Sequence, residues 1–337
     1  NSWVTAMSAQ ASDMSGWLLM GLPGAAYATG MGNYWIAIGL AIGTILNWAF
    51  VAKPLRRFTE VCGDSITIPQ YLQNRFKTDS PVVRMVCAVV IFIFFLVYTT
   101  SAFVSGGKLF QVVFNIDPTN ETYTKAAVII SALIIIIYTF LGGFNAVAWT
   151  DFVCAVLMIV GMVMLGWAVI GEAGGLTAAM ERAAAAQLAD PSADLSSSPI
   201  FSPNANGALP WTLLFSAWIL VGFGTAGLPQ SAVRCMSYQS SADLHRAMIV
   251  STIVCGALMI GITVIGVFAR GLPDFDLAGA STDHVVPRLI TQHLTPIEAG
   301  ITLIGPLAAT MSTVSSLLIA ASSAVVKDLL LAARPEL

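Results

Sequence analysis

Residues 5–24 of this 337-residue chain have the sequence TAMSAQASDMSGWLLMGLPG. Small and polar residues interrupt its apolar character at 11–16, and Gly21 and Pro23 follow. Asp13 stands inside the interruption, although a carboxylate at the centre of a bilayer costs roughly 2.5–3.5 kcal/mol. The stretch therefore predicts a membrane-spanning helix that is broken at a functional position.

The composition of the whole chain supports a membrane environment. Apolar residues make up 57% of it, charged residues 10%, and the mean hydropathy is +0.81. A soluble domain would have roughly 25% charged residues, so the bilayer must be the solvent for most of this surface. The five cysteines lack the spacing of metal ligands and are expected to pack in the interior. No basic run or motif indicates a nucleic-acid partner.

A spanning helix needs about 20 mostly apolar residues. By this measure the chain is an all-α, polytopic membrane protein. We predict eight spans, at about residues 3–28, 34–55, 82–113, 124–141, 145–171, 209–232, 244–269 and 297–326.

The basic residues set the orientation of these spans. If the chain begins in the cytoplasm, ten of the 15 Lys and Arg residues lie inside and five outside, in agreement with the positive-inside rule. We then expect an external loop at 172–208, and an amphipathic extracellular loop or short helical lid at 274–295. The cytoplasmic set is Lys53, Arg56, Arg57, Arg75, Lys77, Arg84, Arg234, Arg246, Lys327 and Arg334.

A second interruption lies in the sixth predicted span, between Gly222 and Pro229. The first and sixth spans lie five apart and run in opposite senses, as an inverted repeat of five plus five helices requires. A matched pair of Gly- and Pro-interrupted spans indicates a transporter binding site, where unwound carbonyls can bind a cation. The alternative is two unrelated kinks or sites of close helix packing.

Two carboxylates lie within predicted spans. A bound cation is one partner for Asp13, and a helix terminus or protonation are the alternatives. Asp151 begins the fifth span, so it is either an anion favoured by a helix N-terminus or a member of a cation site.

The eighth span has small and hydroxyl residues on one face. Ala309, Ser312, Thr313 and Ser316 recur at helical spacing, with Ser315 beside them. Hydroxyl and carbonyl oxygens suit a hard cation such as sodium. Ordinary helix–helix contact is the alternative, because small hydroxyl residues are enriched at such interfaces.

Three stretches resemble the sodium/solute symporter family, and within it the bacterial sodium/proline symporters most closely. Residues 5–24 resemble the first core helix of the family. YTFLGGF at 138–144, followed by AWTD at 148–151, resembles its linker and fifth core helix, and ATMSTVSS at 309–316 resembles the eighth. The resemblance follows the whole chain in the same order.

The resemblance implies a leucine-transporter-like inverted-repeat fold with ten core helices. Core helices 1–8 would be present, so the chain would be a fragment of the whole protein. Residues 1–337 would form a single transmembrane transporter domain. Its parts would be a first repeat at about 1–171, an extracellular loop at about 172–208 and part of the second repeat at about 209–337.

The resemblance also implies sodium as the coupling ion, with no other metal and no cofactor. Asp13 matches a carboxylate that is important for sodium coupling. Proline transporters commonly have Cys where Ser316 stands, and this departure favours a second ion. The implied ligands are Ala11, Met14, Ala309, Ser312 and Thr313 for the main sodium site, and Asp151, Ser312, Ser315 and Ser316 for a second one.

Among the positions that match the family's substrate pocket, those in the sixth predicted span depart from the residues that proline transporters have. By gapless alignment, Val221 and Thr225 stand where proline transporters have Trp and Tyr, so two aromatic contacts to the solute are lost; Trp218 or Phe223 could compensate. The implied substrate-binding residues are Ser15, Trp17, Gly21, Tyr98, Thr225 and Pro229.

The sequence thus predicts a transporter and not an enzyme: a sodium-coupled symporter of proline or another amino acid that works by alternating access. It would be a multi-pass protein of the bacterial inner (plasma) membrane, with sodium ions, a small solute and lipid as partners. One alternative is sodium-coupled uptake of an organic acid or other small solute. Others are a transporter-like solute sensor, a membrane enzyme using Asp13 and Asp151, and a passive channel.

Overall fold

A computed structural model describes residues 2–114, 116, 120–189, 200–201, 224–238, 241–275, 277 and 281–333. These residues form helices and turns and no strand. The helices are α1 (Ser2–Gly16), η1 (Trp17–Gly21), α2 (Leu22–Thr29), η2 (Met31–Asn33), α3 (Tyr34–Leu46), η3 (Asn47–Ala52), α4 (Lys53–Val61), α5 (Ile68–Arg75), α6 (Val82–Val113), α7 (Glu121–Glu172), α8 (Leu176–Ala189), η5 (Thr225–Gly227), α10 (Pro229–Met236), α11 (Ser241–Ala269), η6 (Thr282–His284), α12 (Val285–His293), α13 (Pro296–Ser323), η7 (Ala324–Leu330) and α14 (Leu331–Ala333).

Several of these helices are membrane-spanning by length and composition. Among the described residues, five helical stretches meet both criteria. They match the predicted spans two, three, four joined to five, seven and eight, whereas most of the sixth predicted span lies outside the described residues. The five stretches are Met31–Val61, Val82–Val113, Glu121–Glu172, Asp243–Ala269 and Pro296–Ala333.

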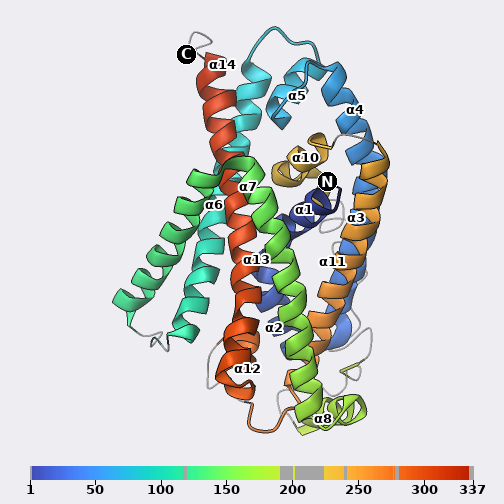
Figure 1. The fold of residues 1–337 in the computed structure, drawn as a ribbon, viewed down its shortest axis with the longest axis vertical. Helices are drawn as coiled ribbons and strands as arrows, with labels where there is room; N and C mark the ends of the chain where they lie inside the picture. Colours follow the sequence, from blue (N-terminus) through green and yellow to red (C-terminus); the bar gives the residue numbers. More distant parts are fainter. Residues whose placement is uncertain are drawn as a thin grey trace.

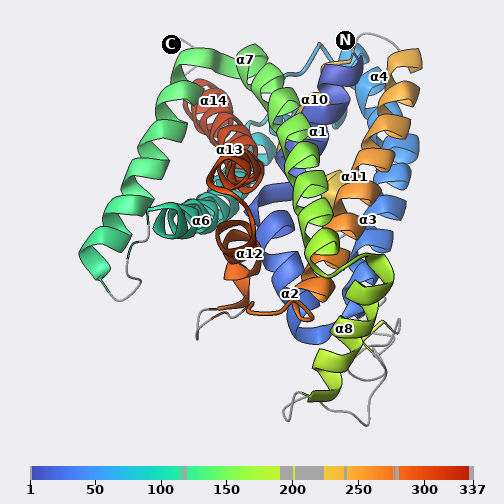
Figure 2. The same ribbon diagram turned by 60° about the horizontal axis from the view of Figure 1, so that its bottom comes forward.

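Helix α7 consists of two limbs that meet at one residue. A straight helix of 52 residues would be about 78 Å long, more than twice the roughly 30 Å hydrocarbon core of a bilayer. At Gly143 the backbone has φ 60° and ψ −172°, a conformation essentially restricted to glycine. The limbs diverge from this bend (Figures 1 and 2). They are the predicted spans at 124–141 and 145–171, and the bend at Gly143 lies in the three-residue gap between them.

The two ends of the molecule have different short helices. Helices α4, α5 and α14 lie at one end, and α8 and α12 lie at the other (Figure 1). The basic residues of α4 and α5 therefore gather at one end, as the predicted orientation requires. Part of the connection predicted at 172–208 is helical, because the sequence of α8 is rich in alanine and has high helix propensity.

The segment at 282–293, which we call the lid, consists of η6 and α12, so part of the range 274–295 is helical, as one of the two expectations for it required. Val285, Leu289 and Ile290 on α12 are fully buried and pack into the main core with residues of α1, α7, α11 and α13. A Cβ atom on Gly24 would lie 2.4 Å from the carbonyl oxygen of Thr282. The glycine thus permits the close approach between α2 and the lid.

Helix α13 occupies a central place in this arrangement. It contacts helices α1, α6 and α7. In both views α13 lies among these three helices (Figures 1 and 2). This position brings the hydroxyl face of the eighth predicted span against the broken first span.

Candidate functional site

The break in the first span is centred on Ser15, within the predicted interruption at 11–16. Its backbone has φ 55° and ψ 174°, a conformation that costs a residue with a side chain of order 1–3 kcal/mol. The N–H of Ser15 donates to Thr313 Oγ1 at 3.0 Å, and the N–H of Trp17 donates to Ser15 Oγ at 3.2 Å. Helix α13 thus binds a backbone group that the break releases, which stabilises the strained conformation.

Four of the five residues predicted for the main sodium site lie together, in what we call the α1–α13 cluster. Ser312 Oγ donates to the carbonyl oxygens of Ala11 at 3.0 Å and Ala309 at 3.2 Å. Thr313 Oγ1 donates to Ala11 at 3.5 Å. All four residues are fully buried, and Met14, the fifth predicted ligand, is buried one turn further along α1.

The α1–α13 cluster offers oxygen ligands without a formal charge. A serine or threonine hydroxyl has two lone pairs and can accept as well as donate. A hard cation would replace the hydrogen bonds donated to Ala11 and be bound by both carbonyl and hydroxyl oxygens. The arrangement can therefore join α1 to α13 through an ion.

Asp151 lies in a second buried group, the Asp151 cluster. Its Oδ2 accepts hydrogen bonds from Arg234 Nη2 at 2.6 Å, Ser8 Oγ at 3.0 Å and Ser316 Oγ at 3.3 Å. Its Oδ1 is buried and has no hydrogen-bond partner among the described residues. Asp151 follows the bend at Gly143 by two helical turns, beyond the reach of a helix-end effect, so the interpretation as an N-terminal anion does not fit.

Arg234 is the member of the Asp151 cluster that the sequence interpretation missed. The sequence analysis counted it only among the cytoplasmic residues, whereas the structure places it in helix α10 (Pro229–Met236) with a side chain that is 4% exposed. The guanidinium also donates to Ser8 Oγ at 2.7 Å, to the Gln230 carbonyl at 2.8 Å and to Ser316 Oγ at 2.5 Å. Its place in the helix that begins directly after the second interruption was the signal available. For Ser8, the available signal was its spacing: it lies seven residues before Ser15 and therefore on the same face of α1.

A cavity of about 650 Å³, the lid-side cavity, lies next to the break. Asp13 lines it, and the buried Oδ1 of Asp13 has no hydrogen-bond partner among the described residues. Five of the six predicted substrate residues line the same cavity: Ser15, Trp17, Gly21, Tyr98 and Thr225.

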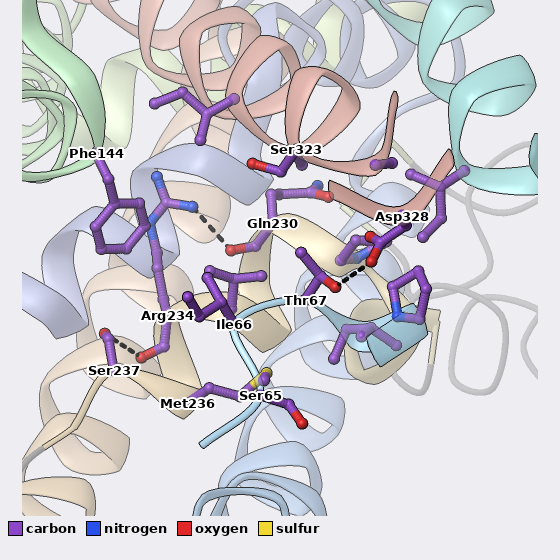
Figure 3. Close-up of a pocket in the computed structure, with 18 of the residues that line it drawn as sticks. Ser65, Ile66, Thr67, Phe144, Gln230, Arg234, Met236, Ser237, Ser323 and Asp328 are labelled. Carbon is purple, nitrogen blue, oxygen red and sulfur yellow. Dashed lines mark hydrogen bonds between the residues drawn. The ribbon is translucent and has the colours of Figure 1, made fainter. Parts of the chain in front are cut away.

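Pro229, the sixth predicted substrate residue, lines a different cavity of about 440 Å³, the opposite cavity (Figure 3). Leu228 is extended, with φ −75° and ψ 116°, and turns the chain between η5 and α10. Leu228 therefore faces the lid-side cavity and Pro229 the other. The alignment could not reveal this change of direction. Positions 218, 221 and 223 lie outside the described residues.

The two cavities approach the clusters from opposite ends of the molecule. The lid-side cavity is lined by Asp283 of the lid, and the opposite cavity by Thr67 before α5 and Asp328 in η7. Within the described part of the chain they share no lining residue, and neither is lined by Ser312 or Thr313. The α1–α13 cluster thus lies in closed structure, whereas Arg234 and Ser316 line the opposite cavity.

Two curated relatives are similar to this chain over most of its length. The sodium/proline symporter of Haemophilus influenzae is 37% identical over 336 residues, which are 97% of this chain and 63% of the relative. The high-affinity proline transporter PutP of Bacillus subtilis is 37% identical over 334 residues, 97% of this chain and 65% of the relative. The chain therefore spans less than two thirds of the length of either relative.

A solved structure has the same fold. It is the substrate-bound outward-open state of a Na+-coupled sialic acid symporter, with a TM-score of 0.74 and 19% identity, covering 98% of this chain and 65% of that one. The all-α, leucine-transporter-like fold expected from the sequence is thus confirmed. The model of the sodium:solute symporter family matches residues 1–337. The chain therefore belongs to the sodium:solute symporter family.

Proposed function

We propose that the protein containing this chain is a secondary active transporter that couples inward movement of sodium to uptake of a small solute. The observation that carries the proposal is the broken backbone at Ser15 beside the hydroxyls of Ser312 and Thr313, enclosed between two cavities from opposite ends. Unwound backbone inside a membrane is tolerated only where protein or a polar cavity satisfies it. A bound cation would satisfy the carbonyl oxygens of this unwound backbone.

In the proposed cycle, sodium enters through the lid-side cavity and is bound by Ala11, Met14, Ala309, Ser312 and Thr313. This joins α1 to α13 and orders the floor of the cavity, where the solute binds. Asp13 adds its negative field without being a ligand. One positive charge moving down the membrane potential contributes roughly 2.3 kcal/mol per 100 mV. The cavity then closes and the opposite cavity opens.

A second sodium site is part of the proposal. It would consist of Asp151, Ser312, Ser315 and Ser316, where Ser315 and Ser316 donate to the Ser312 carbonyl at 3.0 and 2.8 Å. Arg234 occupies Asp151 Oδ2 in this structure, so a second ion would compete with the guanidinium. A measured coupling of one sodium per solute would contradict this second site.

The solute is proposed to be proline or another amino acid. The names of the curated relatives support proline, and the cavity lined by Trp17 and Tyr98 has room for a small zwitterion. The loss of two aromatic positions at 221 and 225 keeps an organic acid as the second candidate. No covalent bond changes in this cycle, so the proposed activity is transport and not catalysis.

The membrane arrangement completes the proposal. The basic end with α4 and α5 faces the cytoplasm of a bacterium, and the lid faces outward across the inner (plasma) membrane. Residues 1–337 form one transporter domain built from a first repeat and part of an inverted second repeat.

The decisive experiment is uptake into proteoliposomes. The complete protein, with any sequence before or after residues 1–337 retained, is given labelled amino acids and organic acids with and without an inward sodium gradient. We expect concentrative uptake only with the gradient, and we expect proline to be the preferred solute of the panel. Equilibration that ignores the gradient would identify a passive channel, and solute binding without uptake would identify a sensor.

A further inference from the structure

A partly exposed ion pair connects α6 to the lid at the lid-side cavity. Lys108 Nζ lies 2.7 Å from Asp283 Oδ2, and the two side chains are 33% and 39% exposed. Both residues line the cavity, and Asp283 belongs to η6, the first turn of the lid. The pair therefore borders the cavity in which the solute is proposed to bind.

Lys108 is the one cation among the described residues that line this cavity. The other charged residues of the lining are Asp13 and Asp283. A solute with a carboxylate thus meets two like charges and a single opposite charge. Electrostatic complementarity to such a solute depends on whether Lys108 can leave Asp283.

Exposure decides which ion pairs can open at low cost. The carboxylates in the Arg234–Asp151 and Arg84–Asp328 pairs are fully buried, and breaking a buried pair leaves an uncompensated charge. An exposed pair contributes little net stability. A lysine has a flexible stem and three rotatable donors, so Lys108 can change partners easily.

The lid has other contacts that hold it when this pair opens. Leu289 and Ile290 of α12 are fully buried. Burial lowers the pKa of His284, and the nearby Lys108 and Arg288 act in the same direction. The lid group that pairs with Lys108 is Asp283.

We propose that Lys108 is a specificity-determining residue that exchanges the lid carboxylate of Asp283 for the carboxylate of the solute. The inference rests on the function proposed above and narrows the substrate class to solutes that have a carboxylate. Asp283 is then a competitor for the solute. Entry of the solute removes the charged link between α6 and the lid.

The test uses the complete protein in proteoliposomes, with L-proline as solute and L-prolinamide, which lacks the carboxylate, as competitor. Lys108→Met is expected to raise the KM for proline by about tenfold, the change for roughly 1.4 kcal/mol, and to leave the inhibition constant of prolinamide unchanged. Lys108→Arg keeps a low KM, because a guanidinium also binds carboxylates. Asp283→Asn lowers the KM, because it removes the competitor.

The opposite signs for Lys108→Met and Asp283→Asn separate exchange from a structural link. A purely structural pair would raise the KM in both variants, and would affect proline and prolinamide equally; either result overturns the inference. If Lys108→Met does not fold, Asp283→Asn decides, since its KM must fall.

The uptake panel measured on the wild-type protein distinguishes failure of this inference from failure of the proposed function. If the uptake panel identifies another carboxylate-bearing solute, that solute and its carboxamide replace proline and prolinamide. Sodium-driven uptake only of solutes without a carboxylate refutes the role of Lys108 and leaves the symport proposal standing. Absence of any sodium-driven uptake refutes the proposed function and this inference with it.

Discussion

At the scale of single residues, Ala11 shows how a neutral backbone group can serve as an ion ligand. Its carbonyl receives two hydroxyl hydrogen bonds from α13, which are the contacts that an ion would replace. The strain at Ser15 persists because Thr313 satisfies its released N–H. The same two side chains therefore stabilise the break in this structure, and in the proposed sodium site they would also be ligands of the ion.

Removing both hydroxyls tests the α1–α13 cluster. In Ser312→Ala/Thr313→Ala we expect the sodium concentration for half-maximal uptake to rise by about tenfold or more, because two ligands are lost. Sodium-dependent uptake in proteoliposomes measures it. Thr263→Ala is the matched control, since Thr263 is equally buried and, among the described residues, its hydroxyl bonds to the Met259 carbonyl of its own helix. Equal sodium affinity in the double variant and the control would remove these residues from the site.

At the scale of elements, single residues change the direction of whole helices. Gly143 divides α7 into two limbs, and Leu228 separates the lining of one cavity from that of the other. Both effects come from one residue's backbone angles and need no loop. The gap predicted at 142–144 shows that the sequence can locate such a bend, because two apolar runs of spanning length adjoin there.

The bend at Gly143 gives a stability prediction. A Cβ atom there would meet nothing within 4 Å, yet φ is +60°, so Gly143→Ala costs backbone strain of about 1–3 kcal/mol. We expect a lower thermal unfolding midpoint in detergent. Gly171→Ala, in the same helix and also with open space around it, should unfold at or above the wild-type temperature because it restricts the unfolded chain. Identical midpoints for the two variants would argue against strain at the bend.

At the scale of the whole molecule, buried ion pairs join helices that are distant in sequence. Arg234 and Asp151, with Ser8 and Ser316, link α10, α7, α1 and α13. At the end of the opposite cavity, Asp328 of η7 accepts from Arg84 at 2.7 Å and from Thr67 at 2.8 Å (Figure 3 shows the Thr67 contact). Arg234 of the first pair lines the opposite cavity, so the Asp151 cluster lies beside the cavity that opens in the proposed cycle.

The Arg234–Asp151 pair makes a prediction for global stability. Arg234→Met leaves Asp151 uncompensated, so we expect a loss of about 3–5 kcal/mol and a lower unfolding midpoint in detergent. Arg234→Met/Asp151→Asn should recover much of the loss, since no buried charge remains in the Asp151 cluster. Lys125→Met, in an ion pair whose side chains are 71% and 81% exposed, is the control and should change the midpoint little. A double variant as unstable as the single one would show that the pair is not the cause.

The sequence by itself determined the membrane-spanning helices, the break in the first span and the hydroxyl face of the eighth. These are local properties of hydropathy, helical periodicity and backbone preference, and they need no knowledge of neighbours. Only the tertiary structure decided that Arg234 binds Asp151, 83 residues away, that Pro229 faces a different cavity from Thr225, and that Lys108 meets the lid. Contacts between distant helices depend on how their faces pack, and many packings are compatible with the same local pattern. A charged residue near the end of a predicted span fits a loop as well as a buried pair until its partner is in place.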